Sequence, residues 1–163
     1  MEIQISVRNL VEFILRSGNI DNRKVVSPDN AMQEGGRIHR MIQRRMGSEY
    51  HAEVFLRHSF ATPDYEIRIE GRADGIIIQP NCEIAEVPEL PDVEIPVSYK
   101  DMVTVTIDEI KGTYRDIHKL NEVIPVHLAQ AKCYAYIYGS QNDLRNIRVR
   151  ITYCNIDTEE IKY

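Results

Sequence analysis

The side chains of this 163-residue chain best suited to chemistry are Glu109 and Lys111, in the segment DEIK. Because side chains alternate between the two faces of a β-strand, these two would share one face, while Asp108 and Ile110 would share the other. A carboxylate beside an ammonium group can hold a divalent metal and orient a water molecule next to it. An isolated pair of this kind is also typical of a surface ion pair on an edge strand.

A second carboxylate, Asp74, lies in the segment GRADG between Gly71 and Gly75. Glycines at such a bend would let another group approach closely. Placed opposite Glu109 on a neighbouring strand, Asp74 would supply the second carboxylate of a Mg²⁺ or Mn²⁺ site, because hard cations prefer oxygen ligands. Alone, it is typical of a turn aspartate.

Two predicted helices carry further polar side chains. His39 shares a helical face with Gly35 and Gly36, small residues that would let the helix lie close to a sheet. Gln130 and Tyr134, four positions apart, share one face of a later helix together with His127. Taken singly, His39 is more typical of a packed or half-exposed histidine, and Gln130 with Tyr134 of the polar rim of an amphipathic helix.

The hydrophobic periodicity predicts the elements that position these residues. Helical spacing predicts helices over 5–15, from Asp29 or Asn30 to about 46, and over 126–138, the last beginning at Pro125 and stopped by Gly139. Alternation predicts strands over 52–56, 65–70, 71–78, 102–111 and 144–153, with a connection or short helix at 113–120 and a final segment able to pair with the last strand. This order indicates one α/β domain, residues 1–163, with a central mixed β-sheet flanked by helices.

Residues 79–101 have a different character. They contain four prolines among acidic side chains, which argues against regular structure. We expect an acidic, proline-rich loop inserted between two strands, with no role that the sequence explains.

The net charge of −5 does not indicate a nucleic-acid-binding protein, but the charge is unevenly distributed along the chain. Residues 61–110 carry 12 acidic and three basic side chains, and the flanking segments 1–50 and 111–163 are slightly basic. The three cysteines are odd in number and lack CxxC spacing, which excludes a disulfide framework and a cysteine-only zinc or iron–sulfur site. The sequence has no membrane-length apolar run and no signal peptide, so we expect a cytoplasmic protein with no membrane partner.

In their joint order, the four motifs GxxH (36–39), GRAD (71–74), ExK (109–111) and QxxxY (130–134) resemble the PD-(D/E)XK nuclease superfamily in its RecB/AddB-like branch. Longer segments are similar to the N-terminal nuclease domain of bacterial XPD/DinG-like DNA helicases: ISVRNLVEFILRSG, AMQEGGRIHRMIQRRMG, EGRADGI and IDEIKGTYR. The resemblance implies a restriction-endonuclease-like core. The sequence contains no GxxxxGK[ST] phosphate loop, so we expect an isolated nuclease domain or a stand-alone relative.

The resemblance also implies roles for particular residues. Those implied as metal ligands are His39, Asp74, Glu109 and the main-chain carbonyl of Ile110. Those implied as catalytic or supporting are Lys111, together with Asp74, Glu109, Gln130 and Tyr134. The expected cofactor is Mg²⁺ or Mn²⁺, and no iron–sulfur cluster is expected, because the cysteines that hold one in some relatives are missing.

The leading hypothesis is a metal-dependent DNA nuclease that acts with a helicase motor, in cis or in trans. Its phosphate contacts would come from basic side chains near the motifs: Arg37, Arg40, Arg44, Arg72, Arg115 and Lys132. One alternative is a nuclease-like module that binds DNA or docks a motor domain without cutting, and another is a different metal hydrolase on the same scaffold. The sequence leaves open DNA against RNA, single against double strands, exo- against endonucleolytic cleavage, the number of metals and the oligomeric state.

Overall fold

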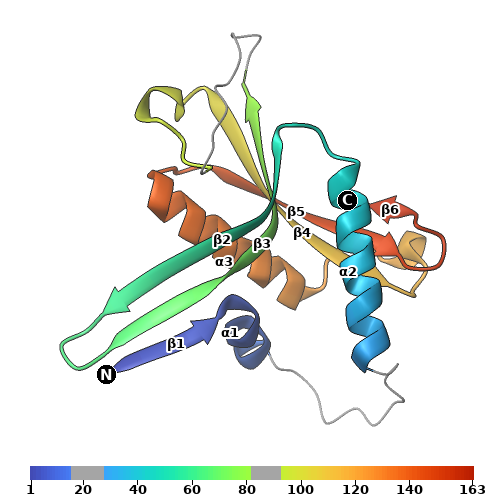
Figure 1. Ribbon diagram of the computed structural model, residues 1–163, viewed down its shortest axis with the longest axis horizontal. Coiled ribbons are helices and arrows are strands. Elements are labelled where there is room, and N and C mark those ends of the chain that lie inside the picture. Colours follow the sequence, from blue (N-terminus) through green and yellow to red (C-terminus); the bar gives the residue numbers. More distant parts are fainter. Residues whose placement is uncertain (16–27, 82–92) are drawn as a thin grey trace.

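The computed structural model describes residues 1–15, 28–81 and 93–163. Its helices are α1 (Val7–Ile14), α2 (Pro28–Arg44) and α3 (Pro125–Asn142), with short 3₁₀ turns at Val97–Tyr99 and Ile117–Lys119. Its strands are β1 (Glu2–Ser6), β2 (Tyr50–Ala61), β3 (Glu66–Pro80), β4 (Val103–Thr113), β5 (Ile147–Asn155) and β6 (Ile161–Lys162). The predicted central mixed sheet flanked by helices is confirmed (Figure 1).

The long strand β3 organises the sheet. β2 pairs with it antiparallel along one edge, from Glu66 to Ile77. Parallel β1 pairs with residues 66–70, and antiparallel β4 with residues 75–80. Because β2 occupies one edge of β3 as far as Ile77, β1 and β4 share the other edge, and residues 71–74 lie between them. β5 then pairs parallel to β4, and β6 antiparallel to β5, as expected for the final segment.

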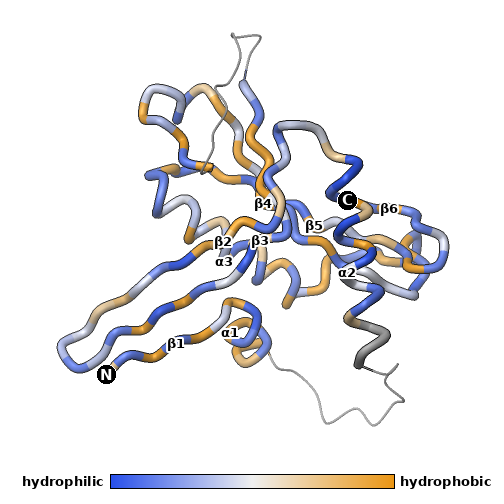
Figure 2. Tube along the Cα trace, in the orientation of Figure 1, coloured by the Kyte–Doolittle hydropathy of each residue, from blue (hydrophilic) through white to orange (hydrophobic). Residues whose placement is uncertain are grey.

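The helices cover both faces of the sheet. Ile107 of β4 belongs to the core that α3 and the start of α1 complete, whereas Ile110, on the opposite face, packs with Ile38 and Ile42 of α2. Alternation along a strand separates these two residues, so the layers are helix, sheet, helix. Figure 2 shows apolar residues concentrated where β3 and β4 run together.

The N-terminal strand β1 was not predicted, and the helix expected over 5–15 begins only at Val7. Ser6 caps this helix, its side chain accepting a hydrogen bond from the Asn9 amide at 3.1 Å. The helical spacing of the apolar residues extends back to Ile5, but Ile5 pairs with Ile69 of β3 instead. The pairing of β1 with β3 therefore sets where the helix begins, and the capping residue Ser6 is the only local signal of that boundary.

The bend predicted between strands 65–70 and 71–78 is wrong, because β3 runs unbroken through Gly71 and Gly75. Both glycines instead admit aromatic rings. A Cβ at Gly71 would lie 2.5 Å from the Tyr134 hydroxyl, and a Cβ at Gly75 would overlap the Tyr50 hydroxyl. The expected close approach at these glycines is therefore present, but inside a strand.

Two other glycine predictions are also wrong. Gly139 does not stop α3, which continues to Asn142 and ends at left-handed Asp143. Gly139 is a packing position, since a Cβ there would come within 3.1 Å of Ile147 Cδ1 and of the Leu144 carbonyl oxygen. On α2, a Cβ at Gly35 would meet nothing within 4 Å, so this glycine does not bring the helix against the sheet.

The first two residues of the insert predicted at 79–101 belong to β3, which pairs with β4 as far as Pro80. The rest of the segment joins β3 to β4, and residues 82–92 lie outside the described ranges. Its end is anchored on α3. The Tyr138 hydroxyl donates to the Val93 carbonyl oxygen at 2.6 Å, and the Ile95 amide donates to Asn142 Oδ1 at 2.9 Å. Ile95 is buried in the core, so this part of the segment is not a free loop.

Substituting Gly75 by alanine is expected to destabilise the fold by ~1–3 kcal/mol, because the methyl group must displace the Tyr50 ring. The matched control is Gly35→Ala, whose methyl group has free space in a helix and is expected to stabilise by ~0.5–1 kcal/mol. Urea unfolding of both variants measures the two effects. Equal stability of Gly75→Ala and the parent would contradict the packing of Tyr50 over β3.

In the part of the chain that the structure describes, no helix combines the length and apolarity needed to cross a bilayer.

Candidate active site

The candidate site lies where β3 and β4 part. Their paired register ends at Gly75 and Asp108, and β4 then continues beside β5. Asp74, the next residue of β3, bridges the gap with its side chain, because its Oδ2 accepts a hydrogen bond from the Ile110 amide at 2.7 Å. The predicted neighbours Asp74 and Glu109 therefore flank the same opening.

His39 of α2 reaches the same opening from one face. Its Nε2 lies 3.1 Å from the Ile110 carbonyl oxygen, and since a carbonyl only accepts, Nε2 carries the proton. Its Nδ1 lies 3.4 Å from Asp74 Oδ1. In the neutral ring this leaves the Nδ1 lone pair turned toward Asp74, which is the arrangement of a metal-binding histidine oriented by a backbone carbonyl. His39 and Asp74, implied as ligands of one ion, therefore lie side by side, and the Ile110 carbonyl, implied as a further ligand, accepts a hydrogen bond from His39.

Glu53 of β2 is a site residue that the sequence did not indicate. The β2–β3 register is continuous except at Glu53 opposite Asp74, and Glu53 has a left-handed φ of 56°. Gln43 of α2 spans this interruption, donating to Glu53 Oε1 and to the Asp74 carbonyl oxygen, both at 3.0 Å. Alternation along 52–56 gave no signal for Glu53, because its placement depends on this local break.

These residues form a cluster with the donor set of a divalent cation. One ligand atom from each of His39, Glu53 and Asp74 lies within 4.8 Å of the others. Burial raises the pKa of Asp74 and the Glu53 charge adds to the rise, whereas His39, the Ile110 amide and Lys111 oppose it. A cation would relieve the repulsion between the two carboxylates, and nitrogen with oxygen donors suits Mn²⁺ or Mg²⁺.

Glu109 is not a member of that close cluster, although the resemblance implies that it ligates the same ion. It is 0% exposed, and its Oε1 forms an ion pair with Lys111 Nζ at 2.6 Å. Neither of its oxygens accepts a regular hydrogen bond from a residue within 1–15, 28–81 or 93–163. Burial, followed by the Asp74 charge, raises the pKa of Glu109 to about 8. An ionised carboxylate buried in this way destabilises the folded protein unless further positive charge lies beside it, so the site fits a metal ion.

The helix α3 supplies the other face of the opening. Lys111 Nζ lies 3.5 Å from Gln130 Oε1, so two residues implied as catalytic or supporting lie close together. Burial and the charges of Glu109 and Asp74 raise the pKa of Tyr134, whose ring covers Gly71. His127 Nδ1, on the same helix, lies 3.0 Å from the Tyr153 hydroxyl, and that hydroxyl accepts a hydrogen bond from the Ile124 amide. Burial and the nearby Lys111 lower the pKa of His127 to about 4.

Asp108, adjacent to Glu109, faces the other side of the sheet, as predicted. It is completely buried and accepts two hydrogen bonds from Arg150, at 3.0 and 2.8 Å, one from Thr152 at 2.5 Å and one from Tyr50 at 3.1 Å. This satisfied network contrasts with Glu109, whose only close partner is Lys111, and it fixes β4 at the point where it leaves β3.

The predicted phosphate-binding residues differ in their surroundings. Arg37 donates to Glu34 at 2.9 Å, to Glu159 at 2.6 Å and to the Ile156 carbonyl oxygen at 2.9 Å, which ties α2 to the β5–β6 connection. The other five are exposed: Arg40, Arg44, Arg72, Arg115 and Lys132.

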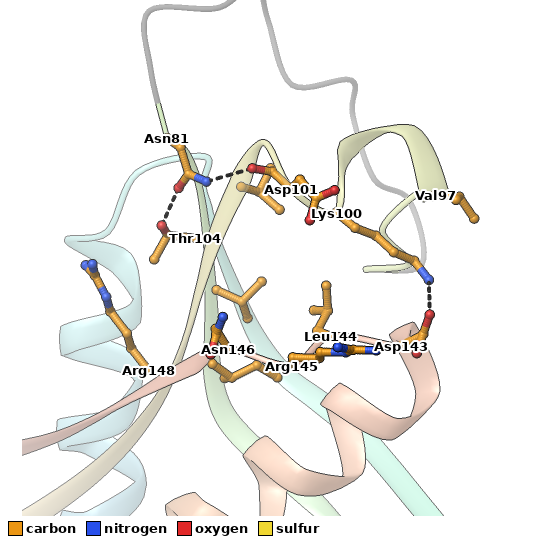
Figure 3. Close-up of a pocket in the computed structure, with 13 residues that line it drawn as sticks. Asn81, Val97, Lys100, Asp101, Thr104, Asp143, Leu144, Arg145, Asn146 and Arg148 are labelled. Carbon is orange, nitrogen blue, oxygen red and sulfur yellow. Dashed lines mark hydrogen bonds and ion pairs between the residues drawn. The ribbon is translucent and has the colours of Figure 1, made fainter.

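A hollow of about 670 Å³ lies at the other end of β4 (Figure 3). It is lined by Val103 and Val105 of β4 and by the α3–β5 connection, where Lys100 pairs with Asp143 at 3.4 Å. Because it begins at the opposite end of the strand from Glu109 and Lys111 and holds none of the clustered ligands, it is not the candidate active site.

No known family model and no curated protein matches this sequence. Among solved structures, the crystal structure of SSO0001 is similar, with a TM-score of 0.55 and 16% sequence identity. The alignment covers 99% of this chain and 66% of that one, so the chain spans about two thirds of the solved protein's length. At this identity, the likeness concerns the arrangement of helices and strands alone.

Proposed function

We propose that this protein is a metal-dependent DNA nuclease of the PD-(D/E)XK type, with a restriction-endonuclease-like core. One observation carries the proposal: His39, Asp74, Glu109 and Lys111, taken from three motifs in the expected order, meet at the point where β3 and β4 part. Perturbed carboxylates at such a point favour a catalytic site over a surface ion pair.

The residues that would hold the ion are His39, Asp74 and Glu109, with the Ile110 carbonyl beside them. When bound, a divalent ion would lower the pKa of a coordinated water and neutralise charge on the phosphate. The imidazole of His39, a softer ligand than a carboxylate, favours Mn²⁺ over Mg²⁺.

The chain's own side chains would orient the reactants. Lys111, held between Glu109 and Gln130, would position the attacking water or stabilise the negative charge that develops on the phosphate. Tyr134 is buried with its ring over Gly71 and would form a wall of the site on the α3 side. The exposed Arg40, Arg72 and Lys132 would supply phosphate contacts that do not depend on sequence.

Such an enzyme would act on DNA in the cytoplasm beside a helicase motor, because several segments of this chain resemble nuclease domains that precede a helicase motor. A pull-down that uses the whole chain and DNA helicases of the same cell tests this association.

Cleavage of end-labelled single-stranded and duplex DNA tests the activity. We expect cleavage with Mn²⁺ or Mg²⁺, complete loss on chelation by EDTA and recovery when Mn²⁺ is added back in excess. Binding should weaken steeply with salt, by an amount that reports the number of phosphate contacts. DNA binding without cleavage under either metal would favour the non-cleaving module instead, and cleavage of other phosphoesters alone would favour a different metal hydrolase.

A further inference from the structure

We propose that Glu53 is a metal ligand of this site, supplied by β2 and additional to the residues that the four motifs contain. The inference rests on the proposed metal-dependent function. It assigns to the centre a fourth side chain and to β2 a direct part in ion binding.

The first support is position. The ligand atoms that lie within 4.8 Å of one another belong to His39, Glu53 and Asp74, whereas Glu109 is turned toward Lys111. An imidazole and two carboxylates, each on a different element of the fold, form a donor set that Mn²⁺ accepts. In the arrangement of the described side chains, Glu53 is therefore better placed than Glu109 to share an ion with His39 and Asp74.

The second support is independent of this cluster. Glu109 is completely buried beside Asp74 and leaves both oxygens without a regular hydrogen bond in the described part of the chain. Its one close partner is Lys111, whose Nζ lies 2.6 Å from Oε1. Burying a carboxylate with a single cation beside it is costly, so a second positive charge between β3 and β4 would stabilise it. A cation held by Asp74 and Glu53 would supply that charge.

The third support is the construction of the Glu53 position. Gln43 holds Glu53 Oε1 at 3.0 Å and with the same amide group holds the Asp74 carbonyl oxygen. One amide thus fixes the Glu53 carboxylate against the backbone of Asp74, as ligands oriented by a surrounding polar group are. Glu53 is exposed, so an ion can reach it from solvent.

The test is a Mn²⁺ titration of the whole chain without DNA. Calorimetry measures the heat of binding, and the loss of the free-Mn²⁺ signal in electron paramagnetic resonance measures the bound ion. We expect Glu53→Gln to weaken Mn²⁺ binding by at least ~10-fold. The matched control is Glu49→Gln, at an exposed glutamate that directly precedes β2 and lies outside the cluster. This variant should bind Mn²⁺ like the parent. Glu53→Gly is a second variant, which also accepts the left-handed backbone and should lose the same affinity.

Parent-like affinity in both Glu53→Gln and Glu53→Gly would overturn the proposal, and so would an absence of Mn²⁺ binding by the parent. Weakened binding in both variants would support it whether or not the protein cuts DNA. Because binding is measured without substrate, a failure of this ligand assignment is distinguishable from a failure of the nuclease function.

Discussion

Lys111→Ala is expected to reduce DNA cleavage by ~10²–10³-fold, the usual cost of removing one group that stabilises charge in a transition state. Lys111 pairs with a completely buried carboxylate and lies beside Gln130, so its ammonium is directed into the opening. Binding of Mn²⁺ and DNA should change much less than the rate, because Lys111 is not a proposed ligand. Single-turnover cleavage with saturating enzyme measures the rate separately from binding.

The control for this variant is Lys100→Ala. Lys100 is also paired with a carboxylate, Asp143, at 3.4 Å, but it lines the hollow at the far end of β4. Its removal should leave the cleavage rate unchanged. Equal cleavage by Lys111→Ala and the parent would remove the catalytic role of Lys111 from the account.

The second large effect is expected in Glu109→Gln, which should abolish cleavage and stabilise the metal-free protein at pH 8. The amide occupies nearly the same volume as the carboxylate and carries no charge next to Asp74. We expect a gain of roughly 2–4 kcal/mol at pH 8, equivalent to a rise in Tm of about 5–10 °C for a domain of this size. Thermal unfolding in EDTA measures this gain, and added Mn²⁺ should raise the Tm of the parent more than that of the variant.

The pH dependence of the parent follows from the same carboxyl group. Its pKa is about 8 in the folded protein and near 4.5 when unfolded, so between these values the folded state binds more protons. The stability of the metal-free parent therefore falls as pH rises from about 4.5 to 8, and Glu109→Gln should lose most of this slope. Glu122→Gln, at an exposed position, is the control and should keep it. An unchanged slope in Glu109→Gln would show that Glu109 is ionised in the folded protein without metal.

The sequence predicted which residues lie on common faces of the candidate site, because strand alternation and helical spacing are local rules. They placed Glu109 and Lys111 on one face of β4, and Gln130 and Tyr134 on one face of α3. Joint motif order then indicated Asp74 and His39, which the structure brings to 3.4 Å of each other. These are the parts of the site that regular elements position.

The rest depended on contacts between distant segments. Glu53 joins the cluster only because the β2–β3 pairing is interrupted opposite Asp74, and nothing local marks that position. β1 forms because residues 66–70 offer it an edge, against the helical spacing that includes Ile5. The bend predicted at Gly71 failed for a related reason, since that glycine serves the Tyr134 ring from α3.

The most direct test of the account is a crystal structure of the protein soaked with Mn²⁺, with the ion located by its anomalous scattering. We predict a peak where β3 and β4 part, at a ligand distance of about 2.0–2.6 Å from Asp74 and His39, with a carboxylate oxygen of Glu109 or Glu53 completing the contacts. An ion bound elsewhere, or no ion at Asp74 under conditions in which DNA is cut, would contradict the central claim that this opening is a metal-dependent active site.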